Sequence, residues 1–215
     1  MQKANLLTIT IALLVGTTAP SSAKPTCEQI DAAISANEDY VEFALSGDAI
    51  SAKTALVDIS KNFGVVSASL PTQDRSLALE FIANIKMGNR SDSSLAAIEN
   101  YKILASSFEG LLPTTLPSAM LDYAGFKLRA QAAAAHVDWA AVSATNDETS
   151  ANWTKAKTDL SDKAVLDLGE SIQAALAMAI SAKNAKWLDS SAQILLDSVD
   201  LIERQIKNPA KGACR

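Results

Sequence analysis

The chain has a single histidine, His136, among its 215 residues, and it lacks the sequence motifs of the common enzyme classes. A zinc site, a Ser-His-Asp triad or a histidine acid–base pair would each depend on that one residue. No Gly-x-Ser-x-Gly elbow, glycine-rich phosphate loop or Cys-x-x-Cys-His haem attachment motif occurs. We therefore predict a protein that is not an enzyme, with no bound cofactor and no metal site.

Basic charge is also scarce. The chain contains 19 Lys and Arg against 24 Asp and Glu, and no two basic residues are adjacent. Nucleic acids and anionic membrane surfaces attract basic patches, so this acidic balance predicts that the protein does not bind nucleic acid.

Glycine and proline are few, with 8 and 6 residues, whereas alanine is abundant. Alanine is the best helix former, because fixing it in a helix costs no side-chain entropy. No long stretch alternates apolar and polar residues as a half-buried strand would. The composition predicts an all-α protein.

Residues 1–23 have the pattern of a cleavable signal peptide. Lys3 precedes an apolar run from Leu6 to Gly16, and small residues end the segment at Ala23. The run is about 11 residues, short of the roughly 20 that span a bilayer as a helix. We expect cleavage after Ala23, no transmembrane segment in the mature chain, and export to the periplasm, or to the extracellular space where the source has no outer membrane.

The two cysteines, Cys27 and Cys214, lie near the two ends of the mature chain. Their separation excludes a Cys-x-x-Cys redox pair, and an exported protein favours a disulfide between them. Closing so long a loop would stabilise the fold by up to about 5 kcal/mol in the chain-entropy model. Lys24-Pro25-Thr26 before Cys27 does not fit a lipoprotein signal.

Apolar residues at alternating spacings of three and four predict about eight helices in four antiparallel hairpins, arranged as a helical bundle or a short stack of helical hairpins. A corner rich in proline and glycine at 110–117 divides them. Residues 24–215 thus form a single all-α domain or two four-helix halves, 24–112 and 116–215. The hairpin tips are expected at Gly47, Gly88, Asn146 and Asn184. The predicted helices cover 28–46, 49–70, 73–87, 92–108, 118–144, 153–160, 165–182 and 185–207.

His136 follows a run of alanines in the longest predicted helix, 118–144. Helical spacing would place it on one face with Trp139 and small alanines, which leave room for a flat ligand or for a closely packed helix. A cavity between His136 and Met178 could then hold a small ligand, a haem or a metal ion. The alternative is a histidine with a structural role or on the surface.

Trp139, Trp153 and Trp187 all lie in the second half of the chain. They are either core residues between helices or the centre of a partner-binding surface, since tryptophans concentrate binding energy at interfaces. Acidic residues also gather at Glu38, Asp39 and Glu42, at Asp147 and Glu148, and at Asp197, Asp200 and Glu203. We interpret these as solvated helix faces.

These observations favour an exported accessory or adaptor protein that binds another exported or envelope protein. The alternative is a helical bundle that binds a small ligand, a haem or a metal ion near His136.

Overall fold

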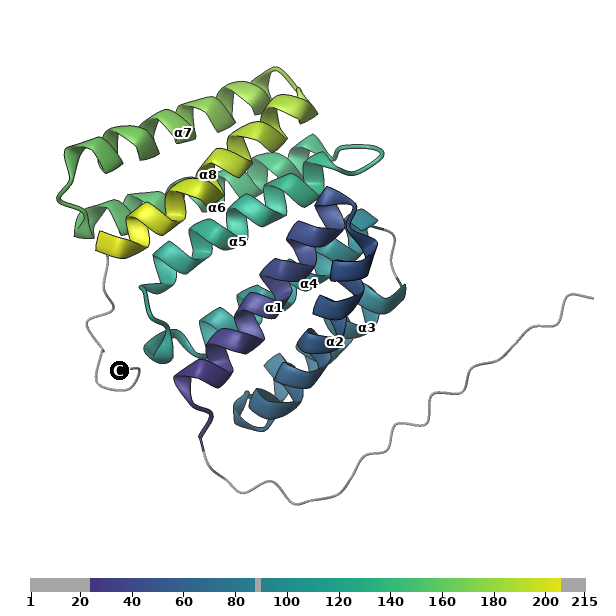
Figure 1. The fold of residues 1–215 in the computed structure, drawn as a ribbon. Helices are drawn as coiled ribbons and strands as arrows, with labels where there is room; N and C mark the ends of the chain where they lie inside the picture. Colours follow the sequence, from purple (N-terminus) through teal and green to yellow (C-terminus); the bar gives the residue numbers. More distant parts are fainter. Residues whose placement is uncertain (1–23, 88–89, 206–215) are drawn as a thin grey trace, which may run out of the picture.

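The computed structural model describes residues 24–87 and 90–205, and within these ranges the chain forms eight α-helices and no strand (Figure 1). The all-α prediction is confirmed. Short 3₁₀ turns follow α2, α4 and α6. The helices are α1 (Cys27–Ser46), α2 (Ala49–Val66), α3 (Thr72–Met87), α4 (Arg90–Ser107), α5 (Leu116–Ala132), α6 (Trp139–Ala156), α7 (Lys163–Ser181) and α8 (Ala185–Gln205).

Side-chain caps define several of the helix ends. Thr26 and Gln29 form a reciprocal capping box at the start of α1. Gly47 ends that helix with a positive φ of 86°, a conformation that favours glycine. The Asp48 carboxylate then accepts the N–H of Ser51 at 3.1 Å and begins α2. The predicted turn at Gly47 is confirmed, and so is the turn at Asn184, whose side chain accepts the N–H of Trp187 at 3.0 Å. Gly88 lies outside the described residues.

The predicted helix over 118–144 is wrong. α5 ends at Ala132, a turn occupies 133–138, and α6 begins at Trp139. The Asp138 carboxylate caps α6 by accepting the N–H groups of Ala140 and Ala141 at 3.0 and 3.1 Å. The alanines of the turn carry no large side chain to bury, and helices in proteins depend mainly on such burial for their stability.

The segment predicted as a helix at 153–160 is not a separate helix, since 153–156 are the end of α6 and a 3₁₀ turn follows. The predicted turn at 146–149 is wrong, because these residues also belong to α6, in which Thr149 is fully buried. Its hydroxyl donates to the carbonyl of Thr145 at 2.7 Å, so a residue that is typical of turns is satisfied within the helix. α2 is also shorter than predicted, because it ends at Val66 and a 3₁₀ turn follows.

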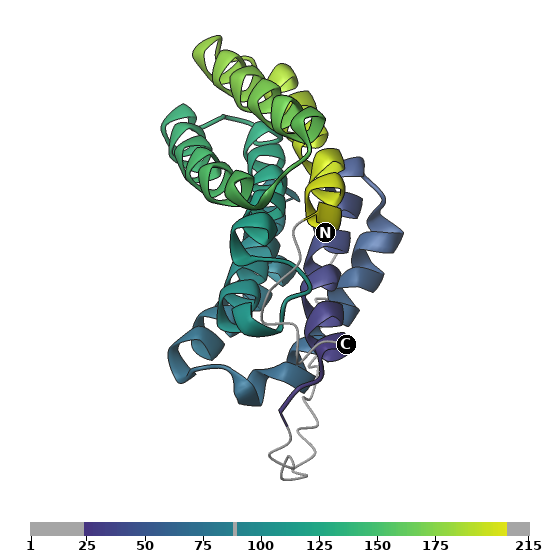
Figure 2. The same cartoon turned by 90° about the vertical axis from the view of Figure 1, so that its left-hand side faces the viewer.

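α5 is the central helix and packs against α1, α4, α6 and α8 (Figures 1 and 2). It contributes to two apolar cores. Tyr123 and Ala124 belong to the core of α1–α5, whereas Leu121 and Leu128 belong to the core of α5–α8. Gly125 lets α8 approach, because a Cβ there would lie 2.6 Å from Cδ2 of Leu196. The division into two four-helix halves stays a prediction, and both cores share α5.

Among the described residues, α7 is the one helix long and apolar enough to cross a membrane by length and composition. Helices of soluble bundles pass the same test, so this is weak evidence. Within the bundle α7 packs mainly on α8, and only 22% of its apolar window is buried.

Candidate functional site

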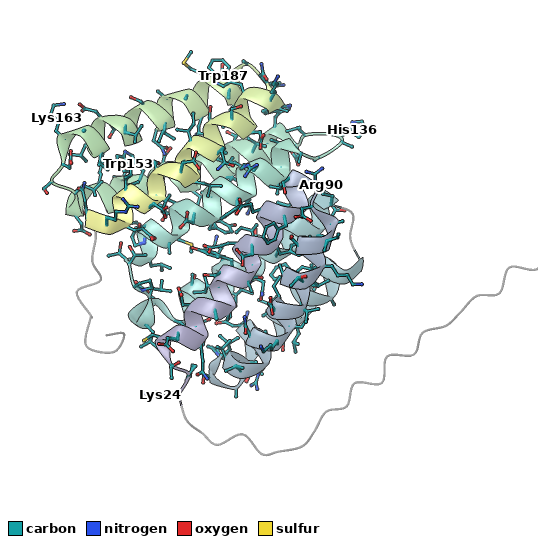
Figure 3. The ribbon with its side chains drawn as sticks, in the orientation of Figure 1. Lys24, Arg90, His136, Trp153, Lys163 and Trp187 are labelled. Carbon is teal, nitrogen blue, oxygen red and sulfur yellow. The ribbon has the colours of Figure 1, made fainter. Side chains whose placement is uncertain are left out.

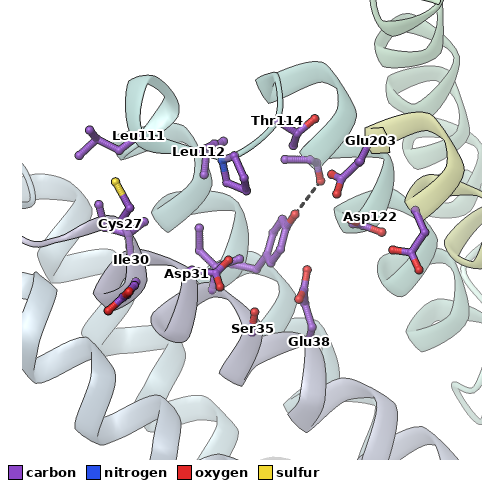
Figure 4. Close-up of a pocket in the computed structure, with 16 residues that line it drawn as sticks. Cys27, Ile30, Asp31, Ser35, Glu38, Leu111, Leu112, Thr114, Asp122 and Glu203 are labelled. Carbon is purple, nitrogen blue, oxygen red and sulfur yellow. Dashed lines mark hydrogen bonds between the residues drawn. The ribbon is translucent and has the colours of Figure 1, made fainter. Parts of the chain in front are cut away.

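The outer face of α1 carries Glu28, Asp31, Ser35 and Glu38 at spacings of three and four residues. This spacing puts all four on one side of the helix. They form one wall of a pocket of about 480 Å³ (Figure 4). The opposite walls come from the segment 111–114, from Tyr101 of α4, and from α5 and α8. The remaining lining residues are Cys27, Ile30, Ile34, Leu111, Leu112, Pro113, Thr114, Ala119, Asp122, Asp200 and Glu203.

Of the residues that the structure describes, six with carboxyl side chains and none with a basic side chain line this pocket. Glu28, Asp31 and Glu38 come from α1, and the others are Asp122 of α5 with Asp200 and Glu203 of α8. None of these six takes part in the ion pairs formed between described residues. We call this feature the acidic pocket.

Three of the six carboxyl side chains are partly buried. Burial raises the pKa of Glu38 to about 8, and the nearby charges of Glu203 and Asp31 add to the effect. Burial raises the pKa of Glu203 to about 7, and the charge of Asp200 is the next cause. The pKa of Asp122 is raised well above its usual range, again by burial first and then by Glu38 and Glu203. Glu38, Asp122 and Glu203 thus share one poorly solvated region and compete for protons.

Tyr101 forms part of the apolar wall of the acidic pocket. It is almost fully buried, and its hydroxyl donates to the carbonyl of Ala119 at 2.8 Å, which is the dashed line in Figure 4. Burial raises its pKa, and so do the charges of Asp122 and Glu38. The hydroxyl stays protonated and positions the ring beside the carboxyls.

Two carboxylates elsewhere in the bundle, those of Glu99 and Glu170, have donor partners. Glu99 accepts hydrogen bonds from Lys127 at 2.6 Å and from Tyr123 at 2.9 Å. Glu170 accepts from Lys157 at 2.8 Å and from the Trp153 indole at 3.1 Å. No such partner faces Glu38 or Asp122 among the described residues.

The geometry of the acidic pocket does not favour a metal ion. Within residues 24–87 and 90–205, no three side chains of the ligating types are close enough together to hold one. The six carboxyls are spread along the walls and do not converge on a point. An extended ligand with several positive charges, or several separate cations, would match this distribution.

The residues predicted for a ligand site lie elsewhere and do not converge. His136 is exposed in the turn between α5 and α6, because the helix that was expected to contain it ends at Ala132 (Figure 3). Met178 is 57% exposed on α7. Neither residue lines the acidic pocket or a smaller pocket beside Arg129 and Asp189.

The three tryptophans have three different environments. Trp153 is 3% exposed and packs on Gly169, where a Cβ would overlap the indole ring. Trp139 is half-buried at the start of α6. Trp187 is 38% exposed in the first turn of α8 (Figure 3). A core role fits Trp153, whereas Trp187 is accessible to a partner.

The predicted disulfide stays a prediction, since Cys214 lies outside the described residues. Cys27 is the first residue of α1 and lines the acidic pocket.

The interpretation of the acidic groups as solvated helix faces holds for Glu42 and Asp197, which are exposed. It is wrong for Glu38 and Glu203, which are half-buried in the acidic pocket. A signal was present in the sequence, because Glu28, Asp31 and Glu38 follow one helical face together. Which side of α8 packs beside this face of α1 depends on contacts between residues far apart in the sequence, so the sequence did not show that Glu203 lies there.

Comparisons of this chain with protein-family models, with curated proteins and with solved structures give no match.

Proposed function

We propose that this protein binds a small organic cation reversibly in the acidic pocket. The observation that carries the proposal is a set of six lining carboxyls, with no basic side chain beside them among residues 24–87 and 90–205, around a cavity of about 480 Å³. Pockets of this size, with apolar walls and a few oriented polar groups, are typical of small-molecule sites. Ligand binding was one of the two functions predicted from the sequence, with a site near His136. We place the site at Glu38 and Glu203 instead.

The energetics support a ligand over a purely structural role. An unpaired carboxylate that is removed from water destabilises a fold, and proteins usually pair or protonate such groups. Burial raises the pKa of Glu38, Asp122 and Glu203, and all three line this pocket. Clusters of this kind are more frequent at functional sites than elsewhere in proteins. A bound cation would supply the missing countercharge and offset the cost.

Titration calorimetry at pH 7.5 and low ionic strength tests the proposal with butylamine, butanol and butyrate. We expect saturable heat with the amine alone, because only the amine carries a positive charge. Glu38→Gln combined with Glu203→Gln should abolish that heat. Glu42→Gln, an exposed acid on the same helix, is the matched control and should bind as the unmodified protein does. Equal binding of all three probes, or binding that survives the double variant, would refute a cation site in the acidic pocket.

A second candidate function is the binding of another exported protein at the surface of α7 and α8. Trp187, Ile194 and Leu201 are exposed and lie seven residues apart, so they form one stripe along α8. Met178 of the adjacent α7 is also exposed. Exposed tryptophan with aliphatic neighbours is common at the centre of protein interfaces.

Site-specific photo-crosslinking in the exported fraction tests this second candidate. A cross-linking residue placed at Ile194 should give a discrete cross-linked product, and the yield of this product should fall when unlabelled protein is added. Ile50 is the control position, because it is 83% exposed and lies on α2 in the other part of the bundle. The same products from both positions would argue against a specific surface on α8.

A further inference from the structure

We propose that the basic segment 206–215 of this chain docks on the exposed acids of the acidic pocket, Glu28, Asp31 and Asp200, and competes there with added cations. The docking itself does not require the proposed function, whereas the competition with a cation rests on it.

Both ends of the described chain lie at the acidic pocket. Cys27 is the first residue of α1, Glu203 is two residues before the end of α8, and both line the pocket. Figure 4 shows them on opposite sides of the close-up. The segment that follows Gln205 therefore starts beside the pocket. A surface next to its point of attachment meets such a tethered segment at a high effective concentration.

The charge of segment 206–215 is opposite to that of the pocket. The segment contains Lys207, Lys211 and Arg215 and no acidic residue, although the whole chain has 19 basic and 24 acidic residues. The described residues that line the pocket include six acids and no base. A single exposed ion pair stabilises a contact only slightly, so the tether and several pairs would act together.

The spacing of the cysteines directs the segment across the pocket. Cys27 is not a free cysteine, and Cys214 is the other cysteine of the chain. Nine residues separate Gln205 from Cys214, so an extended chain between them reaches at most about 30 Å. The predicted disulfide would hold the Cα atoms of the two cysteines within about 7 Å of each other. The residues between would then run from the Glu203 side of the pocket to the Cys27 side.

The exposed acids are the expected partners of this segment, rather than the partly buried Glu38, Asp122 and Glu203. An ammonium group at the surface keeps most of its hydration, whereas a pair inside the pocket must recover a large cost of desolvation. The interior carboxyls thus stay available to an added amine, which has to pass the segment to reach them.

Carbodiimide coupling of the full mature protein, followed by peptide mass spectrometry, tests the docking. The reagent activates a carboxyl, and a lysine amine in contact with it then forms an amide, with release of the reagent as a urea and a net loss of one water. We expect Lys207 or Lys211 to couple to the exposed acids of the acidic pocket within one copy of the chain.

Two pairs of residues serve as controls for the coupling. Lys157 and Glu170 lie 2.8 Å apart on α6–α7 and should couple. Glu42 is an exposed acid of α1 that does not line the pocket, and it should couple to neither Lys207 nor Lys211.

Charge variants test the competition. Lys207→Gln with Lys211→Gln should lower the Kd of butylamine at least threefold in calorimetry at pH 7.5 and 150 mM salt, at which distant charges are screened. Lys183→Gln with Lys186→Gln is the matched control. It removes the same charge near the other end of α8 and should leave the Kd unchanged.

The outcomes separate the docking from the proposed function. Coupling of Lys207 and Lys211 only to acids outside the pocket, or only between two copies, would overturn the docking, and the cation site would stand if butylamine still binds. The same Kd in both double variants would overturn the competition. If the lysines couple as expected and butylamine binds to no form of the protein, the proposed function is wrong and the docking stands.

Discussion

Replacing Glu38 with glutamine should make the protein more stable at alkaline pH. The pKa of Glu38 is about 8 in the folded protein against an ordinary value of 4.5. The folded state therefore holds a proton between these pH values that the unfolded state has released. By linkage, the free energy of unfolding falls as the pH rises from about 4.5 to 8, and stability is greatest on the acid side of this window.

The size of the effect follows from the pKa difference. One pKa unit corresponds to about 1.4 kcal/mol, so the difference for Glu38 sets an upper limit of about 5 kcal/mol. Water in the pocket reduces this value, and so does proton sharing with Asp122 and Glu203. We expect Glu38→Gln to raise the free energy of unfolding by about 2–4 kcal/mol at pH 8.5. Glutamine is close in shape and remains neutral, so the change at pH 5.5 should stay below about 1 kcal/mol.

Urea unfolding followed by circular dichroism at pH 5.5, 7.0 and 8.5 measures this effect without added amine. The unmodified protein should lose stability across the series, and Glu38→Gln should lose less. Glu42→Gln is the control and should follow the unmodified protein at every pH. The lowered pKa values of Asp48 and Glu170 act in the opposite sense, but only below about pH 4.5, outside this range. A Glu38→Gln protein that is less stable at pH 8.5 would show that the carboxylate has a stabilising partner, and the argument for an unpaired site would fail.

Three further predictions concern the bundle. Gly169→Ala should destabilise the protein by about 1–3 kcal/mol, because the added Cβ would overlap the Trp153 ring. Gly64→Ala on α2 meets no neighbouring atom and should stabilise the protein by about 0.5–1 kcal/mol. Thermal unfolding measures both variants, and equal shifts of the melting temperature would contradict the packing of Trp153 on Gly169. Tyr101→Phe should cost about 1–2 kcal/mol in urea unfolding, because the carbonyl of Ala119 loses its donor, and an unchanged midpoint would contradict that role. The mature protein should be two hydrogens lighter than its reduced form by mass spectrometry, and reduction should lower its melting temperature by several degrees; an unchanged mass after reduction would exclude the Cys27–Cys214 disulfide.

Helix content and several helix ends could be predicted from the sequence because they depend on neighbouring residues. Gly47 with Asp48, and Asn184 before Trp187, mark turns through local geometry and local hydrogen bonds. The boundary between α5 and α6 could not be predicted in the same way. Alanine fits a buried or an exposed helical position equally well. The spacing of the alanines around His136 therefore resembled a helix face, although these residues do not pack on a core.

The acidic pocket was missed for a different reason. Spacing shows that Glu28, Asp31 and Glu38 share a face of α1, but it does not show what that face meets. Asp122 and Glu203 reach the pocket because α5 packs between α1 and α8. How well a carboxyl is solvated depends on how the helices pack together. The spacing of acidic residues within one helix is the same whether their face is solvated or buried.

The location of the acidic pocket connects the proposed cation binding to the packing of the bundle. α1 belongs to one apolar core and α8 to the other, and α5 is shared between them. In the absence of a cation, Glu38 of α1 and Glu203 of α8 raise the free energy of this junction by their mutual repulsion and their poor solvation. A ligand that binds only the folded protein stabilises it by mass action. Here the same ligand would also remove the repulsion between Glu38 and Glu203, which lie on helices of different cores. Amine binding should therefore stabilise the contact of α1 and α8 with α5 more than it stabilises the distant α2–α3 and α6–α7 pairs.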